Sequence, residues 1–214
     1  MEKRKQIITA KKSKRVSIEI IPGHFATNHS HINYYIDMTK VKCVQSMATR
    51  AAKVLAQKYV NNTQVDAIIC MEGCEMIGGF MASELAMNGV GSINAKRDIA
   101  VIRPEVNING QMVFQDNVQP MVWNKNVVLL VASATTGKSI NRSVECIKYY
   151  GGNIVGISAI FSNSDHSIDD REIDSIFKKE DLPNYCTYAF KDCPDCKKKR
   201  KIDAIVSSSG YSKL

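Results

Sequence analysis

The stretch Asn126-Val-Val-Leu-Leu-Val-Ala-Ser-Ala-Thr-Thr-Gly-Lys-Ser139 decides the fold of this chain. Its apolar run from Val127 to Val131 predicts a buried strand, and the small residues that follow predict a turn. Ile140 to Tyr150 then predicts a helix. A strand that turns into the start of a helix directs backbone N–H groups and the positive end of the helix dipole at an anion. We therefore predict a binding site for a phosphorylated small molecule, formed by Thr135, Thr136, Gly137, Lys138 and Ser139.

Composition indicates one large domain, or one domain with a smaller appendage, because the chain has 214 residues and is 44 % hydrophobic. No run of about 18 apolar residues occurs, so we expect no membrane span. The first residues, Met-Glu-Lys-Arg-Lys, are not followed by the apolar stretch of a signal peptide. Seven scattered cysteines fit a reducing compartment better than a disulfide framework. We expect a cytoplasmic protein.

The net charge of +8 is concentrated near the two ends of the chain. Residues 3–5, 11–15 and 197–201 contain 12 of the 29 basic residues and no acid, which leaves 17 basic against 21 acidic residues elsewhere. Such segments could contact nucleic acid. No aromatic or helical pattern accompanies them, so solvated segments are the favoured interpretation.

Predicted strands alternate with predicted helices along most of the chain. Residues 66–71, 99–103 and 154–161 are predicted strands, residues 42–59, 76–87 and 169–178 are predicted helices, and Asn109-Gly110 predicts a hairpin turn. This order predicts an α/β fold with a mostly parallel central sheet and helices on both faces. Ligands bind at the carboxyl ends of such strands, so residues 71–73 and 131–138 are expected to face one crevice.

We divide the chain into three parts. Residues 1–40, polar and partly aromatic, form an N-terminal hood segment, and residues 41–185 form the α/β core. Residues 186–214, which contain a Cys-x-x-Cys pair and a basic run, form a tail that packs on the core and can add an edge strand at residues 201–206.

One alternative for the phosphate turn is a P-loop nucleoside triphosphatase. Ala132 to Ser139 fits the pattern Ala-x-x-x-x-Gly-Lys-Ser, a P-loop with alanine in place of its first glycine. That glycine normally frees the backbone to curl around phosphates. No later apolar strand ends in an aspartate that would hold Mg²⁺, because residues 154–161 run into Ser162-Asn163.

Three ordered segments resemble the orotate branch of the type I phosphoribosyltransferases. The strand and Thr135-Thr136-Gly137 turn resemble the loop that binds phosphoribosyl pyrophosphate (PRPP). Residues 23–37, which include Tyr34-Tyr35-Ile-Asp37, are similar to an N-terminal Ser-Gly…Ser-x-Tyr-Tyr-x-Asp segment, and residues 66–79 are similar to the strand and pyrophosphate loop that open the core. The resemblance extends from about residue 20 to 160 and implies PRPP as co-substrate, Mg²⁺ and a homodimer.

The resemblance also implies roles for individual residues. The 5′-phosphate pocket falls on the turn at residues 135–139, and the pyrophosphate loop falls on Glu72, Gly73 and Cys74, next to Glu75. The mobile loop of the family falls after Arg103. Arg103 and Lys138 are the expected catalytic residues, with Arg103 contacting the leaving pyrophosphate.

A departure from the family pattern at two adjacent positions leaves the activity open. The family carries two adjacent acids, which hold the ribose hydroxyls and help to place Mg²⁺, where this chain has Val131 and Ala132. Neither side chain can accept a hydrogen bond. Glu72 or Glu75 could replace the acids as ligands of Mg²⁺. The first hypothesis is therefore transfer of phosphoribose to a nucleobase such as orotate, and the second is a non-catalytic regulatory protein that binds PRPP or a nucleotide.

Cysteine and histidine residues suggest a zinc site. Cys193-Pro-Asp-Cys196 supplies two of the four ligands that Zn²⁺ needs, Cys186 is a candidate third ligand, and His166 is a candidate fourth. His24, His29 and His31 crowd within eight residues. The favoured interpretation of these histidines is a polar loop that covers the ligand.

Overall fold

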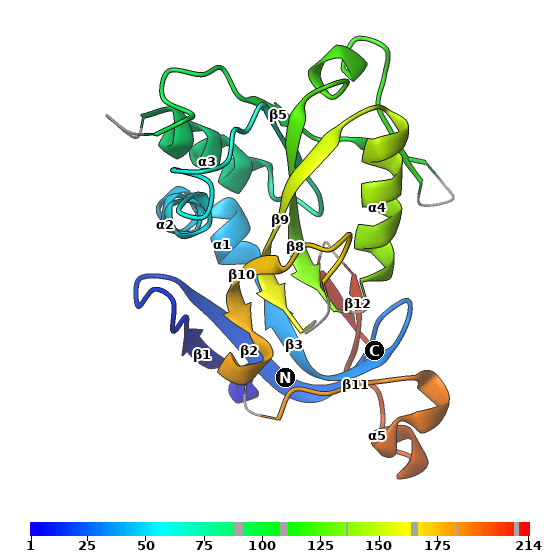
Figure 1. Cartoon of the computed structure of the whole chain (residues 1–214). Helices are drawn as coiled ribbons and strands as arrows, with labels where there is room; N and C mark the ends of the chain where they lie inside the picture. Colours follow the sequence, from blue (N-terminus) through cyan, green and yellow to red (C-terminus); the bar gives the residue numbers. More distant parts are fainter. Residues whose placement is uncertain (88–91, 108–110, 136, 164–166, 183, 208–209) are drawn as a thin grey trace.

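The computed structural model describes residues 1–87, 92–107, 111–135, 137–163, 167–182, 184–207 and 210–214. The described part contains a parallel sheet flanked by helices and a second, mixed sheet that lies beyond the carboxyl ends of the parallel strands (Figure 1). The α/β fold with a mostly parallel central sheet is confirmed.

The parallel sheet has five strands, and every neighbouring pair in it is parallel. Their order is β10 (Ile173–Lys178), β9 (Asn153–Ser162), β8 (Asn126–Ala134), β4 (Ala67–Cys70) and β5 (Ala100–Ile102). The chain therefore passes from β4 outward to β5 and then returns to the other side of β4 as β8. This reversal places the ends of β4 and β8 next to each other.

Helices cover both faces of the parallel sheet. Successive residues of β8 point to opposite faces, so Val128 and Leu130 pack on one side and Val127 and Leu129 on the other. All four are buried, which explains why the strand is one continuous apolar run. The first side carries α1 (Thr39–Cys43), α2 (Gln45–Ala56) and α3 (Glu75–Met87), and the second carries α4 (Lys138–Tyr149).

The segment that follows α2 packs closely on strand β9 of the parallel sheet. Tyr59, just beyond α2, is fully buried, and its hydroxyl lies 2.8 Å from Ser158 Oγ on β9. A Cβ atom added to Gly156 would lie 2.4 Å from the Tyr59 ring. A glycine at position 156 therefore lets the Tyr59 ring pack directly on the sheet.

The two ends of the chain together build the mixed sheet. Its order is β11-β3-β2-β12-β13, with β1 also paired to β2. The strands are β1 (Gln6–Thr9), β2 (Ser17–Ala26), β3 (His31–Asp37), β11 (Thr187–Tyr188), β12 (Ala204–Ser207) and β13 (Gly210–Lys213). The expected edge strand in the tail is β12, but it lies between β2 and β13. The division into three parts stays a prediction, although the hood segment and the tail share this sheet.

The predicted helix at residues 169–178 is wrong, because residues 173–178 form β10. This strand takes its backbone hydrogen bonds from β9 in a parallel pairing that starts at Ile173 and Ile157. Ile176 and Phe177 are buried. At the edge of a sheet, one partner strand and a short apolar segment are enough to override a weak helical pattern.

The predicted hairpin is confirmed in its strands. The strands β6 (Glu105–Val106) and β7 (Met112–Val113) pair antiparallel, while Asn109 and Gly110 lie outside the described residues. The remaining short elements are η1 (Glu2–Arg4), η2 (Gln119–Met121), η3 (Lys179–Asp181), η4 (Phe190–Asp192) and α5 (Pro194–Lys197). None of the helices in the described ranges has the length and apolar character needed to cross a membrane.

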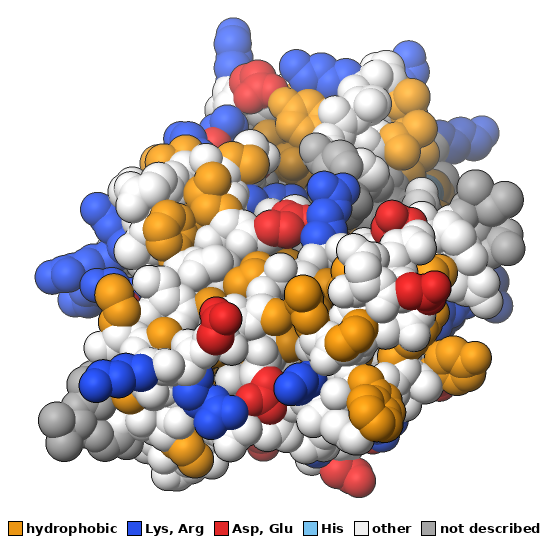
Figure 2. Space-filling model, turned by 90° about the horizontal axis from the view of Figure 1, so that it is seen from above, with side chains coloured by type: hydrophobic (Ala, Val, Ile, Leu, Met, Phe, Trp, Pro, Cys, Tyr) orange, Lys and Arg blue, Asp and Glu red, His pale blue; other side chains and the backbone are white. Residues whose placement is uncertain are grey.

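The basic segment near the N-terminus makes ion pairs with acids from distant parts of the chain. Arg4 pairs with Asp203, and Lys5 pairs with Glu19 at 2.6 Å. On the face shown in Figure 2, Lys and Arg side chains are spread among acidic and apolar ones. Because these basic side chains are paired with acids or mixed with them, they do not form, among the described residues of this face, the basic patch typical of nucleic-acid binding. Contact with nucleic acid stays a prediction.

Candidate functional site

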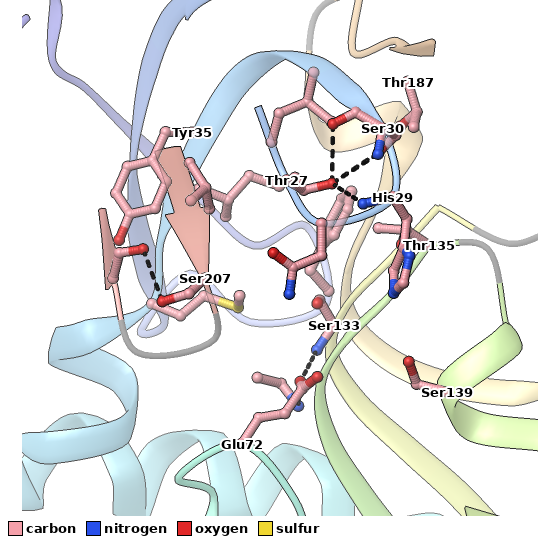
Figure 3. Close-up of a pocket in the computed structure, with 18 of the residues that line it drawn as sticks. Thr27, His29, Ser30, Tyr35, Glu72, Ser133, Thr135, Ser139, Thr187 and Ser207 are labelled. Atoms are coloured by element: carbon pink, nitrogen blue, oxygen red, sulfur yellow. Dashed lines mark hydrogen bonds between the residues drawn. The ribbon is translucent and has the colours of Figure 1, made fainter. Parts of the chain in front are cut away.

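A cavity of about 320 Å³ lies between the mixed sheet and the carboxyl ends of β4, β8 and β9. This volume is within the range of small-molecule sites. Residues from both sheets line it: Thr27, His29 and Tyr35 on one side, and Glu72, Ser133 and Thr135 on the other (Figure 3). The expected crevice at the ends of these strands is therefore present.

The turn between β8 and α4 forms one wall of this cavity. Thr135, Gly137 and Ser139 line it, and Gly137 adopts the left-handed conformation with φ of 72° immediately before the first residue of α4. Glycine adopts this conformation without the strain that a Cβ atom causes. The start of the 12-residue helix α4 thus borders the cavity. Its dipole favours an anion there.

Two residues of the predicted phosphate site are not among the described residues that line the cavity. Thr136 lies outside the described residues, and Lys138 is exposed and is not among the residues that line the cavity. The turn is also short, because β8 extends to Ala134 and α4 begins at Lys138. A P-loop would need the chain to leave the strand near Ala132, where this chain is still in β8.

Glu72 places a carboxylate directly over the end of β8. Its Oε2 accepts hydrogen bonds from the backbone N–H groups of Ala132 at 3.1 Å and Ser133 at 3.2 Å (Figure 3). Glu72 itself has a φ of 57°, a left-handed conformation that is uncommon for a residue with a Cβ atom. The turn after β4 therefore directs this side chain across to the neighbouring strand.

Burial raises the pKa of the Glu72 carboxyl above its usual value. The two backbone N–H groups and the nearby Lys42 ammonium act in the opposite direction but do not outweigh burial. Lys42 Nζ also donates a hydrogen bond to the backbone oxygen of Glu72 at 3.0 Å, and both residues line the cavity. An anionic Glu72 would consequently be stabilised by a cation or by ligand hydroxyls that donate hydrogen bonds.

Val131 and Ala132 are both buried, and their side chains belong to the apolar clusters on the two faces of the sheet. Among the described residues that line the cavity, Glu72 is the sole carboxylate. A carboxylate from the turn after β4, 60 positions earlier in the chain than Ala132, therefore lies at the end of β8.

The remaining residues of the predicted pyrophosphate loop have different environments. Gly73 is exposed with a φ of 79°. Cys74 is fully buried, and burial raises the pKa of its thiol. The Cys74 N–H donates to Met71 O at 3.1 Å within the turn. Neither residue is among those that line the cavity, so their contact with pyrophosphate stays a prediction.

Arg103 follows β5 and is exposed to solvent. Its Nε lies 3.4 Å from Glu75 Oε1, and the residue does not line the cavity. Arg97, which precedes β5, also makes a contact elsewhere and donates to Asp66 Oδ1 at 2.8 Å. The structure therefore does not bring Arg103 and Lys138 together at the cavity, and their catalytic roles stay predictions.

The mixed sheet covers the cavity with polar and aromatic groups. The turn between β2 and β3 is tied by Thr27, whose Oγ1 accepts from the Ser30 N–H at 3.0 Å and donates to Ser30 O at 2.9 Å. His29 in this turn lines the cavity. Tyr35 lines it too, and burial together with the charge of Asp37 raises its pKa to about 12.

The crowded histidines separate into two groups. His29 faces the cavity, whereas His24 and His31 are buried beside Cys193 and Cys196, with all four potential ligand atoms within 4.8 Å of one another. Cys186 is not part of this group, and His166 lies outside the described residues. Of the expected ligands, Cys193 and Cys196 therefore lie in this group and Cys186 does not, and binding of Zn²⁺ stays a prediction.

One signal in the sequence could have located the histidine pair. Ala26 pairs with His31 across the β2–β3 hairpin, so His24 and His31 are diagonal neighbours on one face. Recognising a hairpin around Asn28 would have placed both histidines together. The contribution of Ser133 and Lys42 to the cavity had no comparable signal.

Comparisons with known proteins agree with the sequence resemblance. No family model matches the chain. An orotate phosphoribosyltransferase from Caldanaerobacter subterraneus subsp. tengcongensis is 26% identical over 184 residues, which cover 84% of this chain and 87% of that protein.

Two solved structures show the fold. Orotate phosphoribosyltransferase of Mycobacterium tuberculosis H37Rv in complex with PRPP has a TM-score of 0.50 at 14% identity, covering 70% of this chain and 83% of that one. Adenine phosphoribosyltransferase from Leishmania donovani has a TM-score of 0.51 at 14% identity, covering 75% of this chain and 78% of that one. The resemblance is therefore confirmed: this chain has the fold of the type I phosphoribosyltransferases and is similar in sequence to an orotate phosphoribosyltransferase.

Proposed function

We propose that this protein binds PRPP or a nucleoside monophosphate in the cavity and transfers phosphoribose to a nucleobase such as orotate. The observation that carries the proposal is one arrangement: the Gly137 turn and the Glu72 carboxylate face the same cavity from adjacent strand ends. A sugar phosphate likewise presents an anion together with hydroxyl donors. The orotate phosphoribosyltransferase of Mycobacterium tuberculosis, whose structure is similar, also binds a phosphorylated ligand, PRPP.

The phosphate monoester would lie at the start of α4. The helix dipole and the hydroxyls of Thr135 and Ser139 favour an anion there, and Gly137 allows close approach of the backbone. Lys138 starts the helix and would add positive charge from its exposed position.

The ribose would lie over Glu72. An ionised carboxylate accepts hydrogen bonds from hydroxyls, which is the property that Val131 and Ala132 lack. Because two backbone N–H groups already fix Glu72 Oε2, the carboxylate is oriented before a ligand arrives. Preorganised groups position a substrate without a further entropic cost.

The donor set of the cavity fits a magnesium ion that arrives with PRPP. Mg²⁺ is commonly bound by one or two carboxylates together with phosphate oxygens and water, and Glu72 is the residue that would hold it here. When bound, such an ion neutralises charge on the departing pyrophosphate.

Transfer breaks the bond between the anomeric carbon and pyrophosphate and forms a bond from that carbon to a nitrogen of the base. The carbon becomes cation-like on the way, and negative charge gathers on the leaving group. Glu72 would hold the ribose still while this happens. Arg103 would need to leave Glu75 and turn toward the cavity to reach the pyrophosphate.

Radiolabelled PRPP with Mg²⁺ and a panel of nucleobases tests the proposal. Pyrophosphate release with one base, lost in Glu72→Ala, is the expected result. Absence of both release and PRPP binding would sink the proposal.

A non-catalytic regulatory protein is the second candidate, and two observations favour it. Arg103 is paired with Glu75 outside the cavity, and Val131 and Ala132 supply no carboxylate. Calorimetry separates the two candidates, because this one requires binding of PRPP or a nucleoside monophosphate without pyrophosphate release for any base. A homodimer, implied by the resemblance, stays a prediction that sedimentation would test.

A further inference from the structure

We propose that His24, His31, Cys193 and Cys196 bind one structural Zn²⁺ ion that fastens the tail of the chain to the β2–β3 hairpin. The proposal does not depend on the function of the cavity. It rests on the geometry of the four side chains, on the partner of the second nitrogen of His24, and on the connectivity around them.

The ligand atoms all lie within 4.8 Å of one another, and four of the distances between them are close to those of a tetrahedral zinc site. Bonds of about 2.0–2.1 Å to nitrogen and about 2.3 Å to sulfur place neighbouring ligand atoms about 3.3–3.8 Å apart. His24 Nε2 lies 3.0 Å from His31 Nδ1, 3.4 Å from Cys193 Sγ and 3.6 Å from Cys196 Sγ. Cys196 Sγ lies 3.3 Å from His31 Nδ1. Four ligands and no open position are typical of structural rather than catalytic zinc.

The outer contacts of His24 orient it as a ligand. Its Nδ1 lies 3.0 Å from the backbone oxygen of Arg200 and 3.3 Å from that of Lys201. A backbone oxygen only accepts hydrogen bonds, so the ring proton belongs on Nδ1 and the lone pair of Nε2 faces the two thiols. Zinc-binding histidines commonly donate their second N–H in this way.

The cysteine pair has the local form of a zinc-binding turn. Cys193 precedes α5 and Cys196 lies within it, and the Lys197 N–H donates to Cys193 O at 3.1 Å. Cys193 is 1% exposed and His24 is 1% exposed. Cys196, by contrast, is exposed. Burying one thiol against two imidazoles is costly unless these polar groups are satisfied together.

The connectivity shows what the ion would fasten. The tail runs along β3 as β11, turns through η4 and α5, and returns beside β2 as β12 (Figure 1). Tyr188 pairs with His31, and Ala204 pairs with Phe25, next to His24. The tail therefore pairs with both strands of the β2–β3 hairpin, through β11 on one side and β12 on the other. The four ligands lie where the tail crosses from one side of the hairpin to the other. Linking segments about 170 positions apart restricts the unfolded chain strongly.

Metal content tests the proposal directly. Protein purified without chelators should contain one zinc per chain by plasma mass spectrometry. Cys196→Ser and His31→Asn should lower the affinity for Zn²⁺ by more than about 100-fold, because even outer contacts of a metal contribute 10- to 100-fold. Cys186→Ser and Cys43→Ser, which alter cysteines outside the cluster, should retain full zinc content.

A titration of the unmodified protein covers the case in which a variant does not fold. After chelation, added Co²⁺ should produce the d–d bands of a tetrahedral site and a thiolate charge-transfer band, and Zn²⁺ should displace both. Zn²⁺ should also raise the melting temperature of the chelated protein. A hydrogen-bonded thiol–imidazole cluster that binds neither metal would overturn the proposal. A Cys193–Cys196 disulfide, seen as the loss of two hydrogens in the intact mass, would overturn it as well.

Discussion

Glu72 Oε2 accepts a hydrogen bond from the backbone N–H of Ala132, so an acid from one strand end lies where the adjacent strand carries none. In the sequence, β8 carries no acidic residue. In three dimensions, a carboxylate is present within the same cavity. This relationship makes Glu72 the first residue to test.

Glu72→Gln should change how stability depends on pH. Because the pKa of Glu72 is raised in the folded state, its ionisation opposes folding, and the wild type loses stability as pH rises through that pKa. We expect equal unfolding free energies for variant and wild type well below pH 4.5 and a more stable variant at pH 7.5. Each unit of pKa shift corresponds to about 1.4 kcal/mol. Urea unfolding across this range measures the difference, with Glu145→Gln on the exposed face of α4 as the matched control. If the difference in unfolding free energy between variant and wild type does not change with pH, the raised pKa of Glu72 is contradicted.

The same Glu72→Gln substitution should weaken binding of Mg²⁺ with PRPP by at least about tenfold. Glutamine can still accept a hydrogen bond from one backbone N–H, but it carries no charge to balance a cation. Isothermal titration with PRPP in the presence of Mg²⁺ measures the loss. Equal affinity of variant and wild type would show that the ribose and the metal are bound elsewhere.

Gly137→Ala should weaken binding of phosphorylated ligands at least about tenfold. The added Cβ would be held at a φ of 72° and would lie 3.2 Å from Ile168 Cδ1, so the turn before α4 must shift. The strain is worth about 1–2 kcal/mol. Gly79→Ala is the matched control, since a Cβ there meets nothing within 4 Å and lies in the interior of α3. Calorimetry with a nucleoside monophosphate should find the control unchanged.

Arg103→Ala should separate transfer from binding. If Arg103 neutralises charge on the departing pyrophosphate, turnover should fall about 100-fold or more. Affinity for a nucleoside monophosphate, which has no pyrophosphate, should stay the same. Arg142→Ala, an exposed position on α4, controls for loss of surface charge. Unchanged turnover in Arg103→Ala would remove this residue from the mechanism.

Chelation of the proposed zinc site should weaken ligand binding indirectly. The turn that joins His24 to His31 contains Thr27 and His29, which line the cavity. We expect a several-fold loss of PRPP affinity in chelated protein and recovery on addition of Zn²⁺, measured by calorimetry. Full affinity without zinc would show that the hydrogen bonds of Thr27 fix the turn by themselves.

The sequence was sufficient for the parts of the fold that depend on local pattern. The strands β8 and β9 are continuous apolar runs because both of their faces are buried, and few other structures explain such runs. The edge strand β10 was mistaken for a helix, because its structure depends on pairing with β9 rather than on its own residues. Local pattern cannot reveal a partner that is supplied by the fold.

The candidate site was harder to predict for the same reason. Thr135 and Gly137 lie in the turn after β8 and Ser139 lies at the start of α4, so their approach to the cavity follows from the strand and helix around them. The contact of Glu72 with Ala132 instead depends on an unusual backbone conformation. The histidine and cysteine cluster depends on how two distant segments cross. No short-range rule predicts either arrangement.

The interleaving of early and late strands in the mixed sheet also bears on how the molecule is made. A nascent chain translated only as far as β10 already contains the whole parallel sheet, yet it lacks β12, the neighbour of β2. Such a chain would already have the cavity residues of the β2–β3 hairpin, but it would lack Thr187, Val206, Ser207 and Gly210, which also line the cavity. Deletion of β12 and β13 is consequently expected to change the lining of the cavity, although these strands lie far from Gly137 in sequence.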